Sequence, residues 1–253
     1  MIKQSEIKNI SRQYVVPIST IERDYTQNWI LSFLPKMAFK GGTCLRKVYF
    51  KDYRFSDDLD FTLLEETNIA NLEDKILNAI QQAKTRSNID FINEINSKEV
   101  KNGYSFDIYF RITRVTGSPL KIKLDLTKNE NEHIIDKITQ KVINHPYSDK
   151  IDIKILVYSL DEMFAEKTRS LFERTRPRDL YDIWYLNKNI KFNKTLFKKK
   201  CDFKKVDPNI EDFISKKSKF ENAWEASLRH QLPELPSATD VFGNVIHFLK
   251  KVI

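Results

Sequence analysis

The sequence predicts an α/β (α+β) fold, a mixed β-sheet with flanking helices that is followed by a helical C-terminal lobe. Residues 104–112 (YSFDIYFRI) and 120–126 (LKIKLDL) alternate between apolar and polar side chains, as strands with one buried face do. From Leu160 onward the apolar residues recur with helical spacing, first in LDEMFAEKTRSLFERT and then in PRDLYDIWYL. The chain is 41% hydrophobic and 12% aromatic, which is enough apolar material for a packed core.

The other elements are predicted in chain order from periodicity and turn signals. Helical spacing covers residues 20–35 and 71–84. Thr43 is placed to cap a helix that starts at Cys44. Strands are expected at 37–39, 59–64, 89–95, 104–112, 120–126 and 151–157, with the turn RVTGSP between the fourth and the fifth. We therefore divide the chain into an α/β core with N-terminal helices at 1–158 and a helical lobe at 159–253.

Charge and cysteine content restrict the class of protein. The formal net charge is +8, and ten lysines against four acidic residues fall between Lys191 and Lys219. Such a stretch is the expected footprint of a polyanion, and it is equally typical of a solvated lysine-rich helix. Cys44 and Cys201 are too few for a disulfide scaffold and have no metal-binding spacing, so we expect free thiols in the reducing cytoplasm. No apolar run is long enough to span a membrane.

Three aspartates, Asp57, Asp58 and Asp60, stand within four residues at the start of an apolar strand. In an extended chain Asp58 and Asp60 point to one face, about 6.6 Å apart along the strand, while Leu59 and Phe61 point to the other. Like charges this close repel each other, and a divalent cation that prefers oxygen ligands, Mg²⁺ or Mn²⁺, removes the repulsion. The alternative is a solvated acidic turn without a function.

Gly41 and Gly42 stand between a predicted strand and a predicted helix, and they are two of only 5 glycines in the chain. At such a junction backbone N–H groups form an anion site, and glycine lets a phosphate approach the main chain. Neither GxxxxGK[ST] nor GxGxxG occurs, which excludes the P-loop and the dinucleotide-binding motif. A phosphate-binding Gly-Gly that is followed sixteen residues later by a metal-binding Asp-x-Asp strand is typical of the nucleotidyltransferase arrangement.

A third carboxylate is expected from a neighbouring strand, because two-metal phosphoryl chemistry needs shared ligands. In KIKLDL, Asp125 shares one strand face with Lys121 and Lys123, whereas Leu124 lies on the other. Lys123 is placed to hold a triphosphate oxygen. The alternative is a surface ion pair between Lys123 and Asp125, which contributes less than about 1 kcal/mol.

The helical lobe carries cations where apolar side chains are expected. Lys167 falls on the apolar stripe of its helix, and Arg174 continues that stripe by one turn. A cation on a buried helix face meets an anion or extends past its apolar neighbours to solvent. Pro177 ends this helix and opens the next, in which Arg178 and Asp182 stand four residues apart and are placed to form a routine helix ion pair.

Together these motifs resemble the AbiEii/AbiGii toxin family, nucleotidyltransferase-like proteins of type IV toxin–antitoxin and abortive-infection systems. The resemblance spans about residues 37–187, with the motifs in the family's order. The matching residues are Lys40, Gly41, Gly42, Thr43, Leu45, Arg54, Ser56, Asp58, Asp60, Phe61, Lys123, Asp125, Glu162, Lys167, Arg174, Arg178, Asp179 and Asp182. Cys44 departs from the family, which usually has a small residue such as alanine there.

The resemblance implies a nucleotidyltransferase core, an NTP as substrate, Mg²⁺ or Mn²⁺ as cofactor and an antitoxin as partner. It implies metal ligation by Asp58, Asp60 and Asp125. The catalytic residues that it implies are Asp58, Asp60, Lys123, Asp125 and Asp182. The nucleotide-binding residues that it implies are Gly41, Gly42, Thr43, Ser56, Lys123, Lys167, Arg174 and Arg178.

From these observations we expect a toxin that transfers an NMP from an NTP to an acceptor hydroxyl. The acceptor is an RNA, such as a tRNA 3′ end, which the basic C-terminal lobe favours, or a protein. Two alternatives stay open: kinase-like transfer of the terminal phosphate to a protein or nucleotide, and a catalytically silent module that binds RNA or the antitoxin. The intact Asp58/Asp60 pair argues against a silent module, because such a module has no reason to keep repelling charges together.

Overall fold

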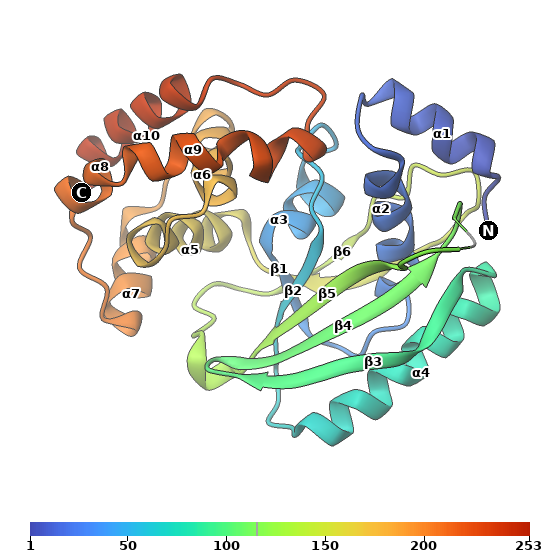
Figure 1. The fold of residues 1–253 in the computed structure, drawn as a ribbon. Coiled ribbons are helices and arrows are strands. Elements are labelled where there is room, and N and C mark those ends of the chain that lie inside the picture. Colours follow the sequence, from blue (N-terminus) through green and yellow to red (C-terminus); the bar gives the residue numbers. More distant parts are fainter. Residues whose placement is uncertain (115) are drawn as a thin grey trace. The chain divides into compact units, whose positions relative to one another are not determined.

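The computed structural model describes residues 1–114 and 116–253; Val115, in the predicted turn 114–119, lies outside the described residues. The chain separates into two compact units. Unit 1 contains Met1–Glu132 and Lys137–Tyr158, and unit 2 contains His133–Asp136 and Ser159–Ile253. Strands and helices both occur in large number, which confirms the predicted α/β fold class (Figure 1).

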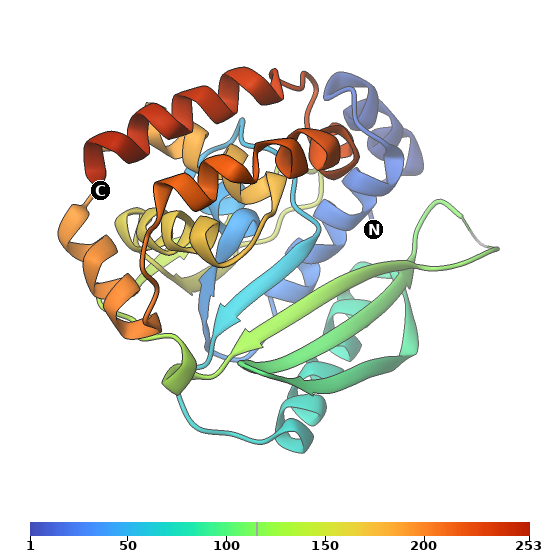
Figure 2. The same ribbon diagram turned by 60° about the vertical axis from the view of Figure 1, so that its left-hand side comes forward.

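Unit 1 is built on one mixed sheet, which has seven strands in the described residues, in the order β3-β4-β5-β2-β1-β7-β6. The strands are β1 (Ala38–Lys40), β2 (Asp58–Thr62), β3 (Asp90–Val100), β4 (Gly103–Arg111), β5 (Leu120–Thr127), β6 (Thr139–Val142) and β7 (Lys154–Val157). The helical elements are α1 (Gln4–Gln13), α2 (Ile18–Leu31), α3 (Gly41–Cys44), η1 (Leu45–Tyr49), α4 (Ile69–Ser87) and η2 (Asn129–Asn131). Strands β2, β5, β4 and β3 run side by side in both views (Figure 1 and Figure 2).

The central strands have one apolar and one polar face. Leu59, Phe61, Phe106, Ile108 and Leu124 are completely buried. Helix α2 packs against β5 and α4, and α4 packs against β3. The apolar face therefore forms the core of unit 1, as the alternation in the sequence predicts.

The strand register brings the polar face together at the middle of the sheet. Strand β2 pairs in parallel with β5, so Asp58 is opposite Lys123 and Asp60 is opposite Asp125. On its other side β2 pairs antiparallel with β1, where Lys40 is opposite Asp60. Side chains at opposed positions share one sheet face. Residues that are far apart in the sequence thus form one polar row across three strands.

The segment after β1 differs from the prediction. The helix begins at Gly41 rather than at Cys44 and continues through η1, a π-helical turn, to Tyr49. Thr43 therefore lies inside the helix and not at its cap; its hydroxyl donates to the carbonyl oxygen of Asp58 at 2.5 Å. The prediction also missed β6, because TQKV is short and mostly exposed and has no apolar alternation.

Unit 2 is helical, with α5 (Leu160–Glu173), α6 (Pro177–Asn189), α7 (Lys194–Lys204), α8 (Ile210–Ser215), α9 (Lys217–Leu228), η3 (Arg229–Gln231) and α10 (Ala238–Val252). Helix α5 packs against α6 and α7, and α6 packs against α9 and α10. The core is rich in aromatic rings; the ring centroids of Phe220 and Phe242 lie 5.6 Å and 4.8 Å from that of Phe213. Pro177 is the first residue of α6, as predicted. No helix in the described ranges is long and apolar enough to cross a membrane.

Candidate active site

The two aspartates of β2 lie on the polar face of the sheet. Asp58 and Asp60 are half-buried, whereas Leu59 between them is fully buried on the opposite face. Asp57 points away from them and accepts a 2.8 Å hydrogen bond from the Arg23 guanidinium on α2. The strand geometry therefore directs the side chain of Asp57 away from those of Asp58 and Asp60. The carboxylates of Asp58 and Asp60 share one face of the sheet.

The two glycines pack directly against this pair and its neighbours. Gly41 has φ +78°, and a Cβ placed on it would lie 2.9 Å from Cγ of Asp60. A Cβ on Gly42 would lie 2.7 Å from Nη2 of Arg54 and 3.0 Å from Oγ of Ser56. The main chain can approach these side chains because neither glycine has a Cβ. Residues other than glycine adopt the positive φ of Gly41 only at a cost in free energy. The Gly-Gly and Asp-x-Asp motifs thus form one local structure.

Several polar or charged side chains around Asp58 and Asp60 are buried, which is unusual for residues of these types. Lys40 and Arg54 are only 7% and 2% exposed, and Thr43 is buried beneath the strand. Arg54 donates to the carbonyl oxygen of Phe55 at 3.1 Å. Burial raises the pKa of the Cys44 thiol well above its usual value, and the nearby charge of Asp60 raises it further. Cys44 therefore stays protonated, which suits a small buried side chain beside a carboxylate.

Two supporting residues were missed by the sequence analysis. On α2, Gln27 donates from Nε2 to the carbonyl oxygens of Ser56 and Asp57, each at 3.0 Å, and Arg23 binds the side chain of Asp57. These contacts fix the backbone immediately before β2. Neither residue has a local motif, because its partners lie about thirty positions away in the sequence.

Asp125 lies on the strand next to β2, where a third carboxylate is predicted, and its side chain is paired with Lys123. It lies opposite Asp60 on β5, and its Oδ2 accepts a hydrogen bond from Nζ of Lys123 at 2.6 Å. The side chains of Asp125 and Lys123 are 33% and 39% exposed, as expected for a surface ion pair. Within the described ranges, no group of three or more His, Cys, Asp or Glu side chains is arranged to hold a metal ion. The carboxylate oxygens of Asp58 and Asp60 fit a divalent cation, and Asp125 as a third ligand stays a prediction.

In unit 2 the predicted cations meet carboxylates on α6. Lys167 donates to Asp179 at 3.1 Å and lies 2.7 Å from Oδ2 of Asp182. Arg174 donates from Nε to the other oxygen of Asp179 at 2.8 Å. Asp182 is completely buried, so Lys167 finds the anion that its position on the apolar stripe requires. Burial by itself raises the pKa of Asp179, but the charges of Lys167 and Arg174 outweigh burial and hold that pKa well below its usual value.

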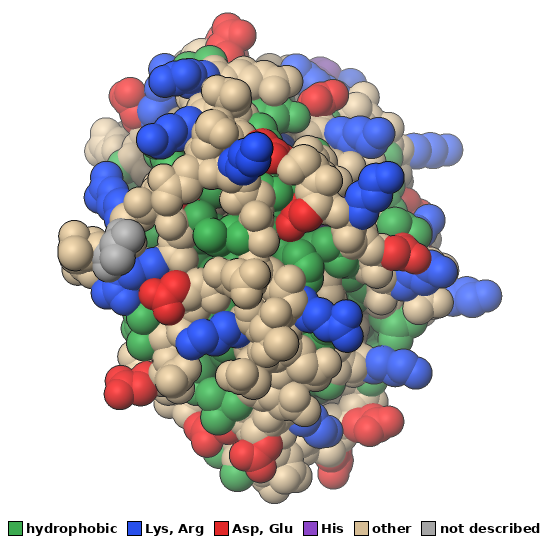
Figure 3. Space-filling model, turned by 90° about the vertical axis from the view of Figure 1, so that its right-hand side faces the viewer, with side chains coloured by type: hydrophobic (Ala, Val, Ile, Leu, Met, Phe, Trp, Pro, Cys, Tyr) green, Lys and Arg blue, Asp and Glu red, His purple; other side chains and the backbone are tan. Residues whose placement is uncertain are grey.

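The basic stretch of unit 2 is less continuous than its sequence suggests. Lys198 and Lys199 are exposed on α7, but Lys200 is completely buried and lies 2.7 Å from Glu162, which is also buried. Glu162 accepts further hydrogen bonds from the backbone N–H groups of Ile135 and Asp136, each at 2.8 Å. Lys200 is thus part of the core of unit 2 and contributes nothing to an electrostatic surface. Figure 3 draws a different face, the side of α1 and α4 of unit 1, and on it lysine and arginine side chains are spread among acidic ones.

Comparison with known structures defines the fold. JHP933 from Helicobacter pylori is 19% identical, with 94% of each chain covered and a TM-score of 0.61. MenT4, a nucleotidyltransferase toxin from Mycobacterium tuberculosis H37Rv, is 18% identical, with 78% of this chain and 68% of that chain covered and a TM-score of 0.55. At this level of identity the likeness concerns the fold, which is a nucleotidyltransferase fold. No curated protein matches the chain.

The family model described as nucleotidyl transferase AbiEii toxin, type IV toxin–antitoxin system, matches residues 26–245. The chain belongs to this family, and it is a nucleotidyltransferase. The resemblance inferred from the motifs is thereby confirmed. The roles of the individual site residues stay predictions.

Proposed function

We propose that the protein is a toxin that transfers an NMP from an NTP to the hydroxyl of an RNA acceptor, such as a tRNA 3′ end. The observation that carries this proposal is the packing of Gly41 against Asp60, on the sheet face that also bears Asp58. It joins an anion-binding turn to a pair of carboxylates within one local structure. Phosphoryl transfer depends mainly on positioning and charge stabilisation, and this arrangement supplies both.

The residues of unit 1 have distinct tasks in this proposal. Asp58 and Asp60 would hold Mg²⁺ or Mn²⁺, which when bound neutralises phosphate charge and activates the acceptor hydroxyl. The N–H groups at Gly41 and Gly42, with the hydroxyl of Ser56, bind phosphate oxygens. Thr43, whose hydroxyl bonds to the carbonyl oxygen of Asp58, positions β2 beside the bound nucleotide.

Lys123 and Asp125 act together in the proposal. Their ion pair is half-exposed, so its separation costs little and frees the lysine to hold a triphosphate oxygen. Asp125 is then released beside Asp60. A Lys123→Met variant would lose the contact with the nucleotide and leave Asp125 without its partner.

The residues of unit 2 are proposed from the family motif. Lys167, Arg174 and Arg178 are assigned to the nucleotide phosphates. Because Asp182 is buried against Lys167, we assign it the role of a positioning residue, in place of the catalytic role that the motif implies. The test is an Asp182→Asn variant, which would raise the KM for the NTP more than it lowers kcat if positioning is the role.

The choice of RNA over protein as acceptor is supported by exposed lysines of α7, which can neutralise RNA phosphates. The reaction is proposed to occur in the cytoplasm, with a cognate antitoxin that restrains it. Kinase-like transfer uses the same carboxylates and is separated by its products, because it releases NDP whereas NMP transfer releases pyrophosphate.

The test uses purified protein, Mg²⁺, total bacterial RNA and each α-labelled NTP in turn, beside an Asp60→Asn variant and an Asp57→Asn control. We expect label in RNA with one NTP, loss of that label in Asp60→Asn and retention in Asp57→Asn. Label in a protein band would move the acceptor to protein. NTP binding without any α-label transfer would overturn the proposal in favour of terminal-phosphate transfer or a silent module.

A further inference from the structure

A cavity of about 430 Å³ lies in unit 1, between two segments that the candidate active site does not use. One wall is formed by η1 and the turn after it, and the other by the end of β6 and the residues that follow. A 2.7 Å hydrogen bond from the N–H of Asn144 to the carbonyl oxygen of Lys47 joins the two walls. A cavity of this size is large enough for a small organic ligand.

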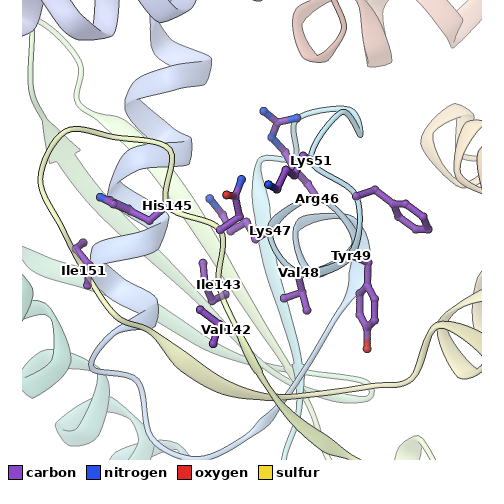
Figure 4. A pocket seen from close by; sticks show the side chains of 11 residues that line it. Arg46, Lys47, Val48, Tyr49, Lys51, Val142, Ile143, His145 and Ile151 are labelled. Carbon is purple, nitrogen blue, oxygen red and sulfur yellow. The ribbon is translucent and has the colours of Figure 1, made fainter.

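The cavity has a cationic end and an apolar end. Figure 4 shows the charged groups of three lining residues in the upper part of the view: Arg46, Lys47 and Lys51. Below them it shows three aliphatic side chains: Val48, Val142 and Ile143. In the described part of the chain no acidic residue lines the cavity. Such a lining fits a ligand with an anionic group at one end and an apolar or aromatic body at the other.

Two of the three cations are buried, and they share one carboxylate. Nζ of Lys47 and Nε of Arg46 lie 2.9 Å and 3.6 Å from Oδ1 of Asp24, which is buried beside them. Burial lowers the pKa of Lys47 and the charge of Arg46 lowers it further, while Asp24 acts in the opposite direction. One negative charge thus faces two positive charges, so this end of the cavity attracts an anion.

Two hydrogen-bond donors at the cationic end are available to a ligand. Lys51 is exposed and makes no ion pair with any described residue. The side-chain amide of Asn144 is half-buried and has no hydrogen-bond partner within the described ranges. His145 is not a third donor, because both of its ring nitrogens already have side-chain partners. A phosphate oxygen can therefore accept hydrogen bonds from Lys51 and Asn144, and the two buried cations add to the attraction.

We propose that this cavity binds a small organic phosphate, with its phosphate group at Lys51 and Asn144 and an aromatic body, such as a nucleobase, at the aliphatic end. The site is separate from the candidate active site: Lys47 stands six residues after Gly41 in one helical segment, roughly 9 Å along its axis. The inference therefore goes beyond nucleotide transfer and does not depend on it.

The test measures binding of AMP to the full-length protein by calorimetry, in low-salt buffer that contains EDTA and neither phosphate nor sulfate. EDTA removes divalent cations from the carboxylates of β2, so that a metal-bound nucleotide there does not contribute. We expect Lys51→Gln to weaken binding about tenfold and Asn144→Ala about threefold. The matched control Lys75→Gln, an exposed lysine on α4, should bind within about twofold of the wild type.

Shortened ligands test the apolar end of the cavity. Ribose 5-phosphate keeps the phosphate of AMP and lacks its base, so it should bind at least about fivefold more weakly than AMP. Absence of AMP binding by the wild type, equal binding by Lys51→Gln, or equal affinities for the two ligands would overturn the proposal.

A second measurement uses only the wild type. Saturating AMP should slow the acetylation of Lys51 by an amine-reactive ester several-fold, as measured by mass spectrometry, and should leave Lys75 unchanged. Unaltered acetylation of Lys51 would place AMP elsewhere, and stronger protection by a single-stranded RNA oligonucleotide at the same concentration would assign the cavity to RNA phosphates; either result overturns the proposal. Transfer of α-label is measured separately without AMP, so a failed cavity site and a failed nucleotidyltransferase proposal give different results.

Discussion

Asp60 and Asp125 stand directly opposite each other on the neighbouring parallel strands β2 and β5. In the same register Asp58 faces Lys123, so each carboxylate of β2 has a charged residue of β5 beside it. On the other side of β2, Lys40 of β1 is opposite Asp60, and on β5 the Nζ of Lys123 contacts the carboxylate of Asp125 at 2.6 Å. Charged side chains of three strands therefore share one face of the sheet.

Neutralisation of the β2 pair should separate activity from stability. Asp58→Asn and Asp60→Asn each replace a half-buried carboxylate by an amide of nearly the same size, so the protein should stay folded with a similar melting temperature. Nucleotide transfer should fall by at least about 100-fold, since loss of metal-site residues has effects of this order. Asp57→Asn is the matched control: it breaks the contact with Arg23 and should lower stability slightly while transfer continues. Normal transfer by Asp60→Asn would remove the pair from the mechanism.

Gly41 and Gly243 should respond to alanine in opposite ways. At Gly41, alanine must adopt φ +78° with its Cβ within contact distance of Asp60, so we expect a loss of about 1–3 kcal/mol in the free energy of unfolding and reduced transfer. Gly243 lies inside α10 with open space around it, so alanine there should add about 0.5–1 kcal/mol. Urea unfolding of the two variants measures both. A stable, active Gly41→Ala protein would show that close approach at this turn is not required.

The buried ion pair of Lys200 should matter for stability and not for RNA. Lys200→Ala leaves Glu162 buried without its cation, which typically costs about 3–5 kcal/mol. Lys198→Ala, two residues away and exposed, should leave the free energy of unfolding within about 0.5 kcal/mol of the wild type and weaken RNA binding instead. Thermal unfolding and RNA binding in two salt concentrations distinguish these roles. Unchanged stability of Lys200→Ala would contradict the burial of this pair.

Folded Cys44 and Cys201 should react slowly with a thiol reagent at pH 8. Both are buried, burial raises the pKa of Cys201 to about 11, and burial with the charge of Asp60 raises that of Cys44 further above its usual value. The reactive thiolate is therefore scarce in the native state. Ellman's reagent should report nearly no thiol before unfolding and two in urea. Rapid reaction of one thiol in the native protein would indicate local opening at that site.

The sequence predicted those parts of the fold and site that depend on local pattern. Local sequence pattern determines the alternation along β4 and β5 and the helical spacing in α5 and α6. Asp58 and Asp60 share a face because strand geometry requires it. Register between strands is different. The placement of Asp125 opposite Asp60 is a long-range property that no local pattern contains.

Burial was the harder property to predict for charged residues. Lys200 lies in a run of three lysines that reads as a solvated surface, and only the packing of α5 against α7 places it beside Glu162. Thr43 was expected as a helix cap because the sequence does not show that α3 follows β1 without a loop. At both positions, tertiary contacts give the residue a role that differs from the role its residue type suggests.

Asp179 should make the stability of unit 2 sensitive to acid. Its carboxylate binds Lys167 and Arg174, and these charges hold its pKa below the unfolded value of about 4, against the opposing effect of burial. A group whose pKa is lower in the folded state stabilises the protein above the unfolded pKa, and this contribution is lost as pH falls through about 4 toward the folded pKa. Asp179→Asn removes that contribution, so its deficit relative to the wild type should be largest at neutral pH and should shrink below about pH 4. Unfolding free energies from pH 7 down to pH 3 measure the difference, with Asp161→Asn, at the first turn of α5, as the control. A deficit that stays constant across this range would show that Asp179 stabilises the unit by packing and not by its charge.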